Sequence, residues 1–393
     1  MGFDETLAIQ MSYELMSGYW KVGNRCFFNK KDCLLLASKI KDFNVTYHFF
    51  DEIYRNIDWK KELSQSLSSM YADRAKKIRD KYDYVAILFS GGADSTNVLK
   101  SFIDNDLHID EIISFGPVKV ADKLLHKFNR MDRSANNLLF EYYEAVVPMY
   151  DYLKKHRPKI KLTVIDYTNE ILSLVDTNNI HKLFLSGCNA NTNITGFYLT
   201  YQSVSRHDKS CVVFGIDKPR LLYNKKEGKF MSYFHDFNMI HGHFPKETFN
   251  GDQASTEYFY YDPKMPYIPA KQCQQILPDL LPIVNPSHPL HSEVMTDKGQ
   301  NLIVNVHGDY VKKLIYPTWN NNIYQANKNQ SHFYNEIGDW FSQTTLTTNR
   351  LKDYLDGQIS ELIAGIHPNF VEYDENDKPQ KLIDLFTKKN FLH

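Results

Sequence analysis

A short polar run between an apolar segment and a helical pattern has the residue types of a phosphate site: Ser90-Gly91-Gly92-Ala93-Asp94-Ser95. Its two adjacent glycines permit positive φ angles and close backbone approach, so that N–H groups can point at phosphate oxygens. The serines add hydroxyl donors, and Asp94 offers a hard carboxylate oxygen for Mg²⁺. A helix after the run favours negative charge at its N-terminus, so together these features predict a site for a nucleoside triphosphate and Mg²⁺.

Other patterns compete with this interpretation of the loop. A tight strand-to-helix turn capped by serine or aspartate would use the same residue types without a ligand. A Walker loop needs Lys followed by Ser or Thr at a fixed spacing, and a dinucleotide fingerprint needs Gly-x-Gly-x-x-Gly; this loop has neither pattern. The flanking pattern favours phosphate binding, because a strand before the loop and a helix after it suit a backbone phosphate cradle.

The elements around the loop predict an α/β fold with an open parallel sheet of about five strands and helices on both faces. Short apolar runs alternate with helical patterns, which is the sequence form of βαβ units. The strands are expected at residues 84–89, 109–115, 160–167 and 211–215, with 183–185 left open as a strand or a helix end. Helices are expected at residues 59–80, after the loop, at 134–155 with an interruption open at Pro148, and at 169–176.

Proline usage suggests how the chain is divided. Of the 15 prolines, four precede residue 240 and the other eleven follow it, so the chain changes character near Pro245. We expect a small N-terminal α+β addition of unknown role at residues 1–70. The nucleotide-binding core would span residues 71–245, and a proline-rich, mainly helical region would span 246–393.

The loop resembles the SGGxDS signature of the N-type ATP pyrophosphatases, or PP-loop family, which includes asparagine, β-lactam and GMP synthetases and tRNA-thiolating enzymes. The resemblance covers roughly residues 82–120. Members cleave ATP between the α and β phosphates, giving an adenylated intermediate and pyrophosphate. The resemblance implies that Ser90, Gly91, Gly92 and Ser95 hold the pyrophosphate part of ATP, with Ala93 also in the ATP-binding loop, and that Asp94 binds Mg²⁺. It also implies that adenine meets backbone groups at the end of the next strand, at Ser114 and Phe115.

A second group of charged residues follows the expected strand at 211–215, namely Asp217, Lys218 and Arg220. Because the carboxyl ends of neighbouring strands share one crevice, Asp217 could face Asp94 as a second Mg²⁺ ligand. Lys218 or Arg220 would then act catalytically by neutralising charge on the departing pyrophosphate. The segment resembles the Gly-x-Gly-Ala-Asp-Glu metal segment of asparagine synthetase-like enzymes, although Lys218 replaces the glutamate. Solvated charges at a strand-to-turn junction are the alternative.

Cysteines and histidines give weaker signals. The five cysteines are far apart and form no Cys-x-x-Cys pair, which argues against a disulfide framework, a zinc site or an iron–sulfur cluster. Thiol transfer at Cys188 remains open, but a lone cysteine is more often an inert small hydrophobe. A metal at His241 and His243 is also open, although no acidic third ligand is near in sequence.

Charge and hydropathy limit the class of protein. The 46 Lys and Arg nearly cancel the 47 Asp and Glu, leaving a net charge of -1, so nothing electrostatic favours a dedicated nucleic-acid binder. The chain contains no apolar run of membrane-spanning length and no signal-peptide pattern at its start. We expect a cytoplasmic protein that does not insert into a membrane, and a homodimer stays open.

The resemblance implies an ATP-dependent ligase that adenylates a carboxylate or amide oxygen for attack by a nitrogen nucleophile. Residue 2 is Gly2, and the roughly 80 residues before the loop are too few for a glutaminase domain. The nitrogen would therefore come from ammonia, a substrate amine or a partner protein. A nucleic-acid base-modifying enzyme, a catalytically silent nucleotide-binding protein and a phosphosulfate reductase-type fold are the alternatives.

Overall fold

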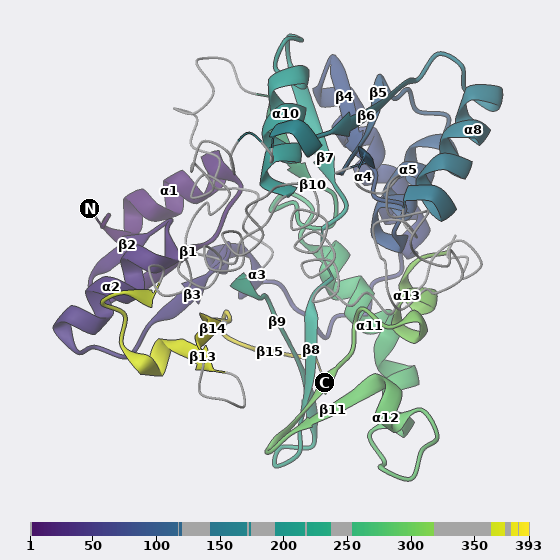
Figure 1. Cartoon of the computed structure of the whole chain (residues 1–393). Helices are drawn as coiled ribbons and strands as arrows, with labels where there is room; N and C mark the ends of the chain where they lie inside the picture. The colour runs from purple at the N-terminus through teal and green to yellow at the C-terminus, as the bar shows by residue number, and fades with distance from the viewer. Residues whose placement is uncertain are drawn as a thin grey trace.

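The computed structural model describes residues 2–116, 118–119, 142–170, 173, 193–216, 218–236, 254–317, 363–373, 379–383 and 385–392. Within them lie a five-stranded parallel sheet, a five-stranded and a three-stranded antiparallel sheet, and a two-stranded ribbon. The parallel sheet occupies the upper part of the molecule in the view of Figure 1, with the N-terminal segment to one side and the antiparallel strands below.

The parallel sheet confirms the expected fold class. Its strands are β4 (Tyr84–Leu88), β5 (Glu111–Gly116), β6 (Lys161–Asp166), β7 (Ser210–Phe214) and β10 (Ser255–Tyr258). They lie in the order β10-β7-β4-β5-β6, and every pairing is parallel. Four of them fall where apolar runs predicted strands. The fifth, β10, lies beyond residue 245, while the candidate strand at 183–185 lies outside the described residues.

The strand order creates a reversal point at the middle of the sheet. The chain runs outward on one side from β4 to β5 and β6, and then returns to the other side of β4 to form β7. The carboxyl ends of β4 and β7 therefore flank the point at which the winding reverses. In open α/β sheets this is the usual place for a ligand crevice.

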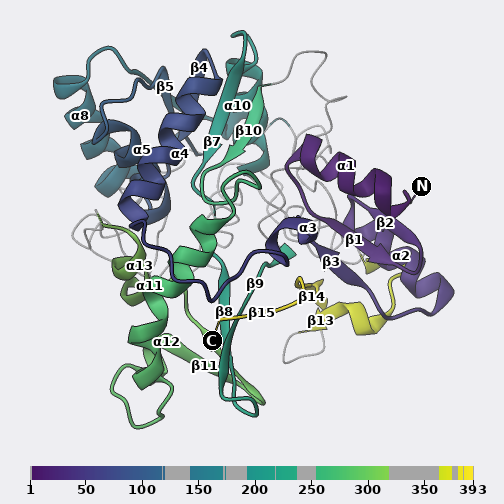
Figure 2. The ribbon, with the colours of Figure 1, turned by 180° about the vertical axis from the view of Figure 1, so that it is seen from behind.

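Helices cover both faces of this sheet: α4 (Leu67–Lys81), α5 (Ala93–Ile103), α8 (Val147–His156), which follows a π-helical turn (Tyr142–Val146), and α10 (Asn193–Val204). Figures 1 and 2 show α4, α5 and α8 on one face and α10 on the other. Pro148 lies in the first turn of α8, where proline is tolerated, and the helical stretch changes there from π to α geometry. Residues 134–141 of the expected helix lie outside the described residues. None of the described helices combines the length and the apolar composition needed to cross a membrane.

The N-terminal segment forms a small α+β layer whose apolar side chains join the same core as the parallel sheet. It contains α1 (Glu5–Leu15), β1 (Tyr19–Val22), β2 (Arg25–Phe27), α2 (Lys30–Ile40), β3 (Thr46–His48) and α3 (Asp51–Tyr54). Its three strands form an antiparallel sheet in the order β2-β1-β3. A buried ion pair ties this layer to the rest of the protein, because Lys30 Nζ lies 2.7 Å from Asp236 Oδ2 and Trp20 Nε1 donates to the same oxygen at 2.9 Å.

The expectation of a mainly helical region at 246–393 is not confirmed. Its described helices are α11 (Tyr267–Ile283), α12 (His291–Val294), α13 (Asp309–Ile315) and the 3-10 turn η6 (Pro368–Phe370). Beside β10, its described strands are β11 (Met295–Lys298), β12 (Asn301–Val304), β13 (Val371–Tyr373), β14 (Pro379–Leu382) and β15 (Asn390–Phe391). A tight hairpin joins β11 to β12 through Gly299, whose φ of +65° suits glycine. The expectation of a helical region rested on proline usage and did not take this turn residue into account.

These C-terminal strands join two strands from the middle of the chain. β8 (Arg220–Asn224) and β9 (Lys229–Tyr233) complete an antiparallel sheet in the order β11-β12-β8-β9-β15. The last described strand, β15, therefore lies beside β9 although more than a hundred residues separate them in sequence. Figure 1 shows this sheet below the parallel one, with α11 and α13 beside it.

A buried ionic network fastens α4 to the edge strand β10. Arg74 is 2% exposed; it donates to Glu257 Oε2 at 2.6 Å, to Asp262 Oδ2 at 2.9 Å and to the Phe259 carbonyl at 3.2 Å. Burial alone would raise the pKa of both carboxyls, but the Arg74 charge and further hydrogen bonds outweigh it, so each pKa is lowered. The network therefore stabilises the fold while both carboxyls are ionised.

Replacing Arg74 with methionine should cost about 3 kcal/mol of unfolding free energy, because Glu257 and Asp262 lose the buried guanidinium group and keep only the more exposed ammonium groups of Lys81 and Lys77. The matched control is Lys76→Met on the same helix, whose side chain is 64% exposed and pairs with Asp80 across one turn. That change should stay within about 0.5 kcal/mol. Chemical denaturation measures both, and equal effects would contradict the structural role of the network.

The same network predicts acid sensitivity. Both carboxyls have lowered pKa values, so their contribution to stability is complete above the ordinary values of 4.5 for Glu257 and 3.8 for Asp262. That contribution is lost as the pH falls through the lowered values of the folded protein. Denaturation curves measured across this pH range should show the fall in unfolding free energy. Glu257→Gln should make the unfolding free energy depend less steeply on pH. An unchanged slope in this variant would show that Glu257 carries none of the acid dependence.

Candidate functional site

The loop after β4 has an open, uncapped end that can face an anion. Gly91 has a φ of +80°, which its lack of a Cβ allows, and Gly92 is the N-cap of α5 without a side-chain cap hydrogen bond. The first N–H groups of α5 have no carbonyl partner within the helix, as at every helix start. The positive end of the helix dipole therefore lies at the loop, where it favours a bound anion.

The two serines hold the loop in shape. Ser95 Oγ accepts a hydrogen bond from Ser90 N at 3.3 Å and donates one to Gly92 O at 3.1 Å. The hydroxyls of Ser90 and Ser95 also lie 3.3 Å apart. Ser95 is buried, whereas Ser90 at the mouth of the loop is exposed. The geometry thus gives Ser95 a role in fixing the turn and leaves Ser90 open to solvent.

The segment after β7 presses directly on this loop, as the shared crevice predicts. A Cβ on Gly215 would lie 3.0 Å from the backbone carbon and oxygen of Asp94 and from the nitrogen of Ser95. Such a distance is tighter than an ordinary van der Waals contact, and backbone atoms have little freedom to move away. Glycine at position 215 is therefore what allows the two strand ends to meet.

Lys218 and Tyr316 both contact the carboxylate of Asp94. Lys218 Nζ forms an ion pair with Asp94 Oδ1, and Tyr316 OH donates a hydrogen bond to the same oxygen. The Lys218 side chain is fully buried, while that of Asp94 is 28% exposed. Lys218 Nζ also lies 5.6 Å from the centre of the Tyr316 ring, within reach of a cation–π interaction. Of the predicted residues, Asp94 and Lys218 are therefore brought together.

A tyrosine cluster supports Asp94 from below. Tyr260 OH donates to the Asp94 carbonyl at 2.9 Å and accepts from Asn97 Nδ2 at 3.0 Å. The Tyr260 ring lies 5.7 Å from that of Tyr316 and 5.6 Å from that of Tyr71. Burial, with the negative charge of Asp94 among the smaller causes, raises the pKa of Tyr260 and Tyr316 well above the usual value. Both phenols therefore stay neutral hydrogen-bond donors near neutral pH.

Of the two residues predicted to contact adenine, Ser114 is buried and hydrogen-bonded elsewhere, and Phe115 is half-buried and packs against another ring. Ser114 Oγ donates to Phe89 O at 2.5 Å and accepts from Tyr150 OH at 3.0 Å. The Phe115 ring packs against Phe197 with centroids 4.8 Å apart. These side chains therefore stabilise the sheet and its contact with α10, and the backbone groups at this strand end remain the candidates for contact with adenine.

The backbone of Phe115 does point toward the loop side of the sheet. Ile113 O accepts from Phe89 N at 2.9 Å, so its carbonyl faces β4, and Gly116 O accepts from Tyr167 N at 3.3 Å on the β6 side. Because backbone groups alternate in direction along a strand, the N–H and C=O of Phe115 face the β4 side. There β4 has already ended at Leu88.

The other predicted site residues are not gathered at the loop by the described contacts. Arg220 is the first residue of β8, where it lies opposite Tyr233 in the antiparallel sheet. Asp217, the predicted second metal ligand, lies outside the described residues. Cys188, His241 and His243 also lie outside them.

The described residues fit Mg²⁺ only in combination with phosphate oxygens. Among them, no group of three or more His, Cys, Asp or Glu side chains is placed to hold a metal ion. Asp94 is the carboxylate at the loop, and an ammonium group already contacts one of its oxygens. Protein Mg²⁺ sites commonly combine one or two carboxylates with substrate phosphates and water, so Asp94 suits a metal that arrives with a triphosphate.

Sequence reasoning missed Tyr260 and Tyr316. Nothing in the aromatic run at 258–261 indicates a contact with Asp94, and Tyr316 is 222 residues from Asp94 with no motif around it. In both views α13, which ends just before Tyr316, lies below α5 (Figures 1 and 2). Only the folded chain could have revealed these contacts.

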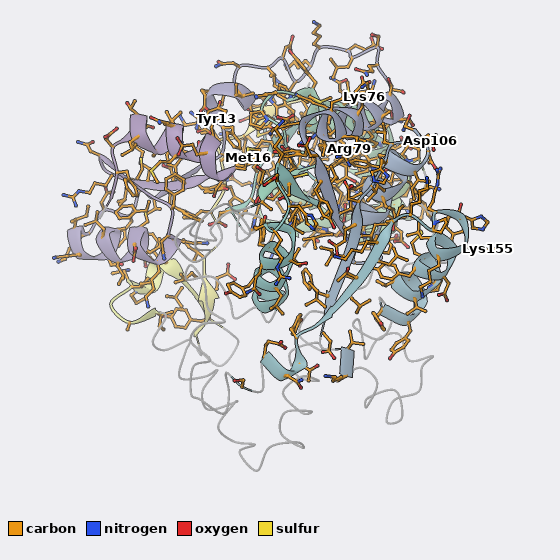
Figure 3. The ribbon with its side chains drawn as sticks, turned by 90° about the horizontal axis from the view of Figure 1, so that it is seen from above. Tyr13, Met16, Lys76, Arg79, Asp106 and Lys155 are labelled. Carbon is orange, nitrogen blue, oxygen red and sulfur yellow. The ribbon has the colours of Figure 1, made fainter. Side chains whose placement is uncertain are left out.

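A surface cavity of about 310 Å³ lies at the opposite, amino-terminal edge of the sheet and is lined by residues 103, 106–109 and 156–160. Figure 3 looks onto this edge, where Arg79, Asp106 and Lys155 are labelled. Arg157 in its wall is already paired with Asp106 at 2.8 Å. The loop at 90–95 and this cavity are therefore separated by the length of the strands.

No model of a known protein family matches the chain, and no curated protein matches its sequence.

Enlarging Gly215 should disturb the loop in proportion to side-chain size. Gly215→Ala adds the Cβ that would meet the backbone of Asp94 and Ser95 at 3.0 Å, and Gly215→Val adds two more methyl groups. We expect the valine variant to lose about 1–3 kcal/mol of stability and to bind ATP more weakly than the alanine variant. Thermal unfolding and equilibrium ATP binding measure these effects. Wild-type stability and ATP affinity in Gly215→Val would show that the close approach of residue 215 to the loop does not require glycine.

Proposed function

We propose that the loop at 90–95 binds ATP with Mg²⁺ and that the protein is an AMP-forming, asparagine synthetase-like ligase. It would adenylate a carboxylate or amide oxygen of a small molecule for attack by ammonia or an amine. The observation that carries the proposal is the meeting of Asp94 and Lys218 beside the uncapped N-terminus of α5. This arrangement offers backbone donors, a carboxylate and a cation at one strand-end crevice.

The reaction needs positioning and charge neutralisation more than covalent help from the protein. A substrate oxygen attacks the α phosphorus, and the bond from that phosphorus to the pyrophosphate oxygen breaks. The nitrogen lone pair then attacks the activated carbon, AMP leaves with the C–O bond electrons, and the nitrogen loses a proton to solvent. When bound, Mg²⁺ would neutralise charge that develops on the departing pyrophosphate.

The chain's own residues account for the remaining requirements. The Gly91 turn and the first N–H groups of α5 would bind the β and γ phosphates, and Lys218 would place a positive charge on the leaving group. Backbone groups of Phe115, which face the loop side of the sheet, are the candidates for contact with adenine. Asp94 would orient the metal by coordinating it through a carboxylate oxygen.

A catalytically silent nucleotide-binding protein is the second candidate, and one observation favours it. Asp94 is already neutralised by Lys218 and hydrogen-bonded by Tyr316. A protein that kept ATP binding while losing metal-dependent cleavage could hold its carboxylate in this state permanently. Binding of ATP without formation of AMP would identify this case.

The test is product analysis with ATP, Mg²⁺ and the dialysable small molecules of a cell extract. We expect AMP and pyrophosphate in equal amounts, and added hydroxylamine should trap an activated carboxylate as a hydroxamate. Asp94→Asn should lower pyrophosphate release by about 10²-fold or more while the far-ultraviolet circular dichroism spectrum is unchanged.

The matched control is Asp104→Asn at the other end of α5, where the carboxylate is half exposed and 3.9 Å from Lys100. This variant should retain wild-type product formation. ADP and phosphate as products would reject the proposal. Full activity of Asp94→Asn would remove Asp94 from the site.

A further inference from the structure

The ion pair at the loop has a consequence for when a metal can bind. Lys218 Nζ and Tyr316 OH both contact Oδ1 of Asp94, the residue proposed to bind Mg²⁺. A divalent cation and an ammonium group compete for the same carboxylate, because both are attracted to its negative charge. The Lys218 side chain is fully buried, so it cannot simply turn into solvent when a metal approaches.

The burial of the Lys218 ammonium group strengthens its hold on the Asp94 carboxylate. A buried ammonium group that leaves the Asp94 carboxylate loses an ion pair that offsets part of its desolvation cost. An incoming anion that takes the place of Asp94 would therefore favour release of the carboxylate by Lys218. A triphosphate brings such anionic oxygens, and the loop directs its own donors to the same space.

We propose that Lys218 acts as an internal placeholder that occupies Asp94 until a triphosphate arrives, so that Mg²⁺ enters only together with the nucleotide. This inference rests on the proposed function for the identity of the ligand. On arrival, Lys218 transfers its ammonium group from Asp94 to phosphate oxygens, and the carboxylate passes to the metal. Charge is balanced at each stage, since one cation leaves the carboxylate as another replaces it.

Tyr316 is the positioning residue in this exchange. Its hydroxyl remains bonded to the carboxylate when the ammonium group leaves, and its ring, 5.6 Å from Lys218 Nζ, borders the space through which that group moves. Tyr260 holds the Asp94 carbonyl at 2.9 Å and so fixes the backbone. Asp94 therefore keeps its direction whichever cation it binds.

The inference is tested by binding of Mn²⁺ alone, as a Mg²⁺ substitute, to the full chain, with electron paramagnetic resonance reporting free Mn²⁺. The wild type should bind it weakly. Lys218→Met should bind it roughly 5- to 150-fold more tightly, the range typical of coupling between two sites. This gain should vanish in the double variant Asp94→Asn/Lys218→Met.

Three further variants distinguish the effect of the Lys218 charge from misfolding and from a general loss of positive charge. Lys218→Gln keeps a hydrogen-bond donor but no charge, so it should gain affinity for Mn²⁺ even if Lys218→Met fails to fold. Lys218→Arg keeps the charge and should bind Mn²⁺ as weakly as the wild type. Lys225→Met, at a lysine whose side chain is 38% exposed in the β8–β9 hairpin, is the control for general loss of positive charge.

A second arm adds α,β-methylene-ATP, which cannot be cleaved between the α and β phosphates. Wild-type affinity for Mn²⁺ should rise with this analogue, and the rise should be smaller in Lys218→Gln. If the wild type does not bind the analogue, the proposed function fails, whereas the arm with Mn²⁺ alone still tests Lys218. Tight Mn²⁺ binding by the wild type, no gain in Lys218→Gln, or a gain independent of Asp94 would overturn the placeholder.

Discussion

The close approach of two strand ends is the constraint on which the site depends. β4 and β7 are neighbours in the parallel sheet, and Gly215 after β7 reaches the backbone of Asp94 and Ser95 without a side chain between them. That approach brings Lys218, three residues later, to the Asp94 carboxylate. Without it, the loop after β4 would be an ordinary glycine turn, and the cation would belong to a separate surface junction.

The loop is also supported from a distant part of the chain. Tyr260 binds the carbonyl of Asp94 and Tyr316 binds its carboxylate, so main chain and side chain are oriented independently. Both phenols have a raised pKa because of burial, and they remain donors rather than adding negative charge. Tyr71 on α4 donates to Ile315 O at 3.0 Å, which anchors the end of α13 beneath the loop. The C-terminal region is thus part of the site's framework.

The proposed chemistry and the resting charge state belong together. A carboxylate that must bind a metal during turnover needs a partner at other times, because a half-buried unpaired charge is costly. Lys218 supplies that partner and is then available for the phosphates. A single lysine would thereby serve both the nucleotide-free and the nucleotide-bound states, and the neutral tyrosines keep the geometry constant between them.

Local sequence patterns determined the parallel sheet, four of its strands and the glycine turn before α5, because apolar runs and turn residues act over a few positions. They could not identify β10 as the fifth strand or the hairpin of β11 and β12, since pairing depends on which distant segments meet. The engagement of Ser114 with Phe89 and Tyr150 was hidden for the same reason. The strand order expected from sequence brought the segment after β7 near Asp94, but only the tertiary structure decided that Lys218 and Tyr316, 124 and 222 residues away, contact its carboxylate, because such contacts leave no periodic signal in the chain.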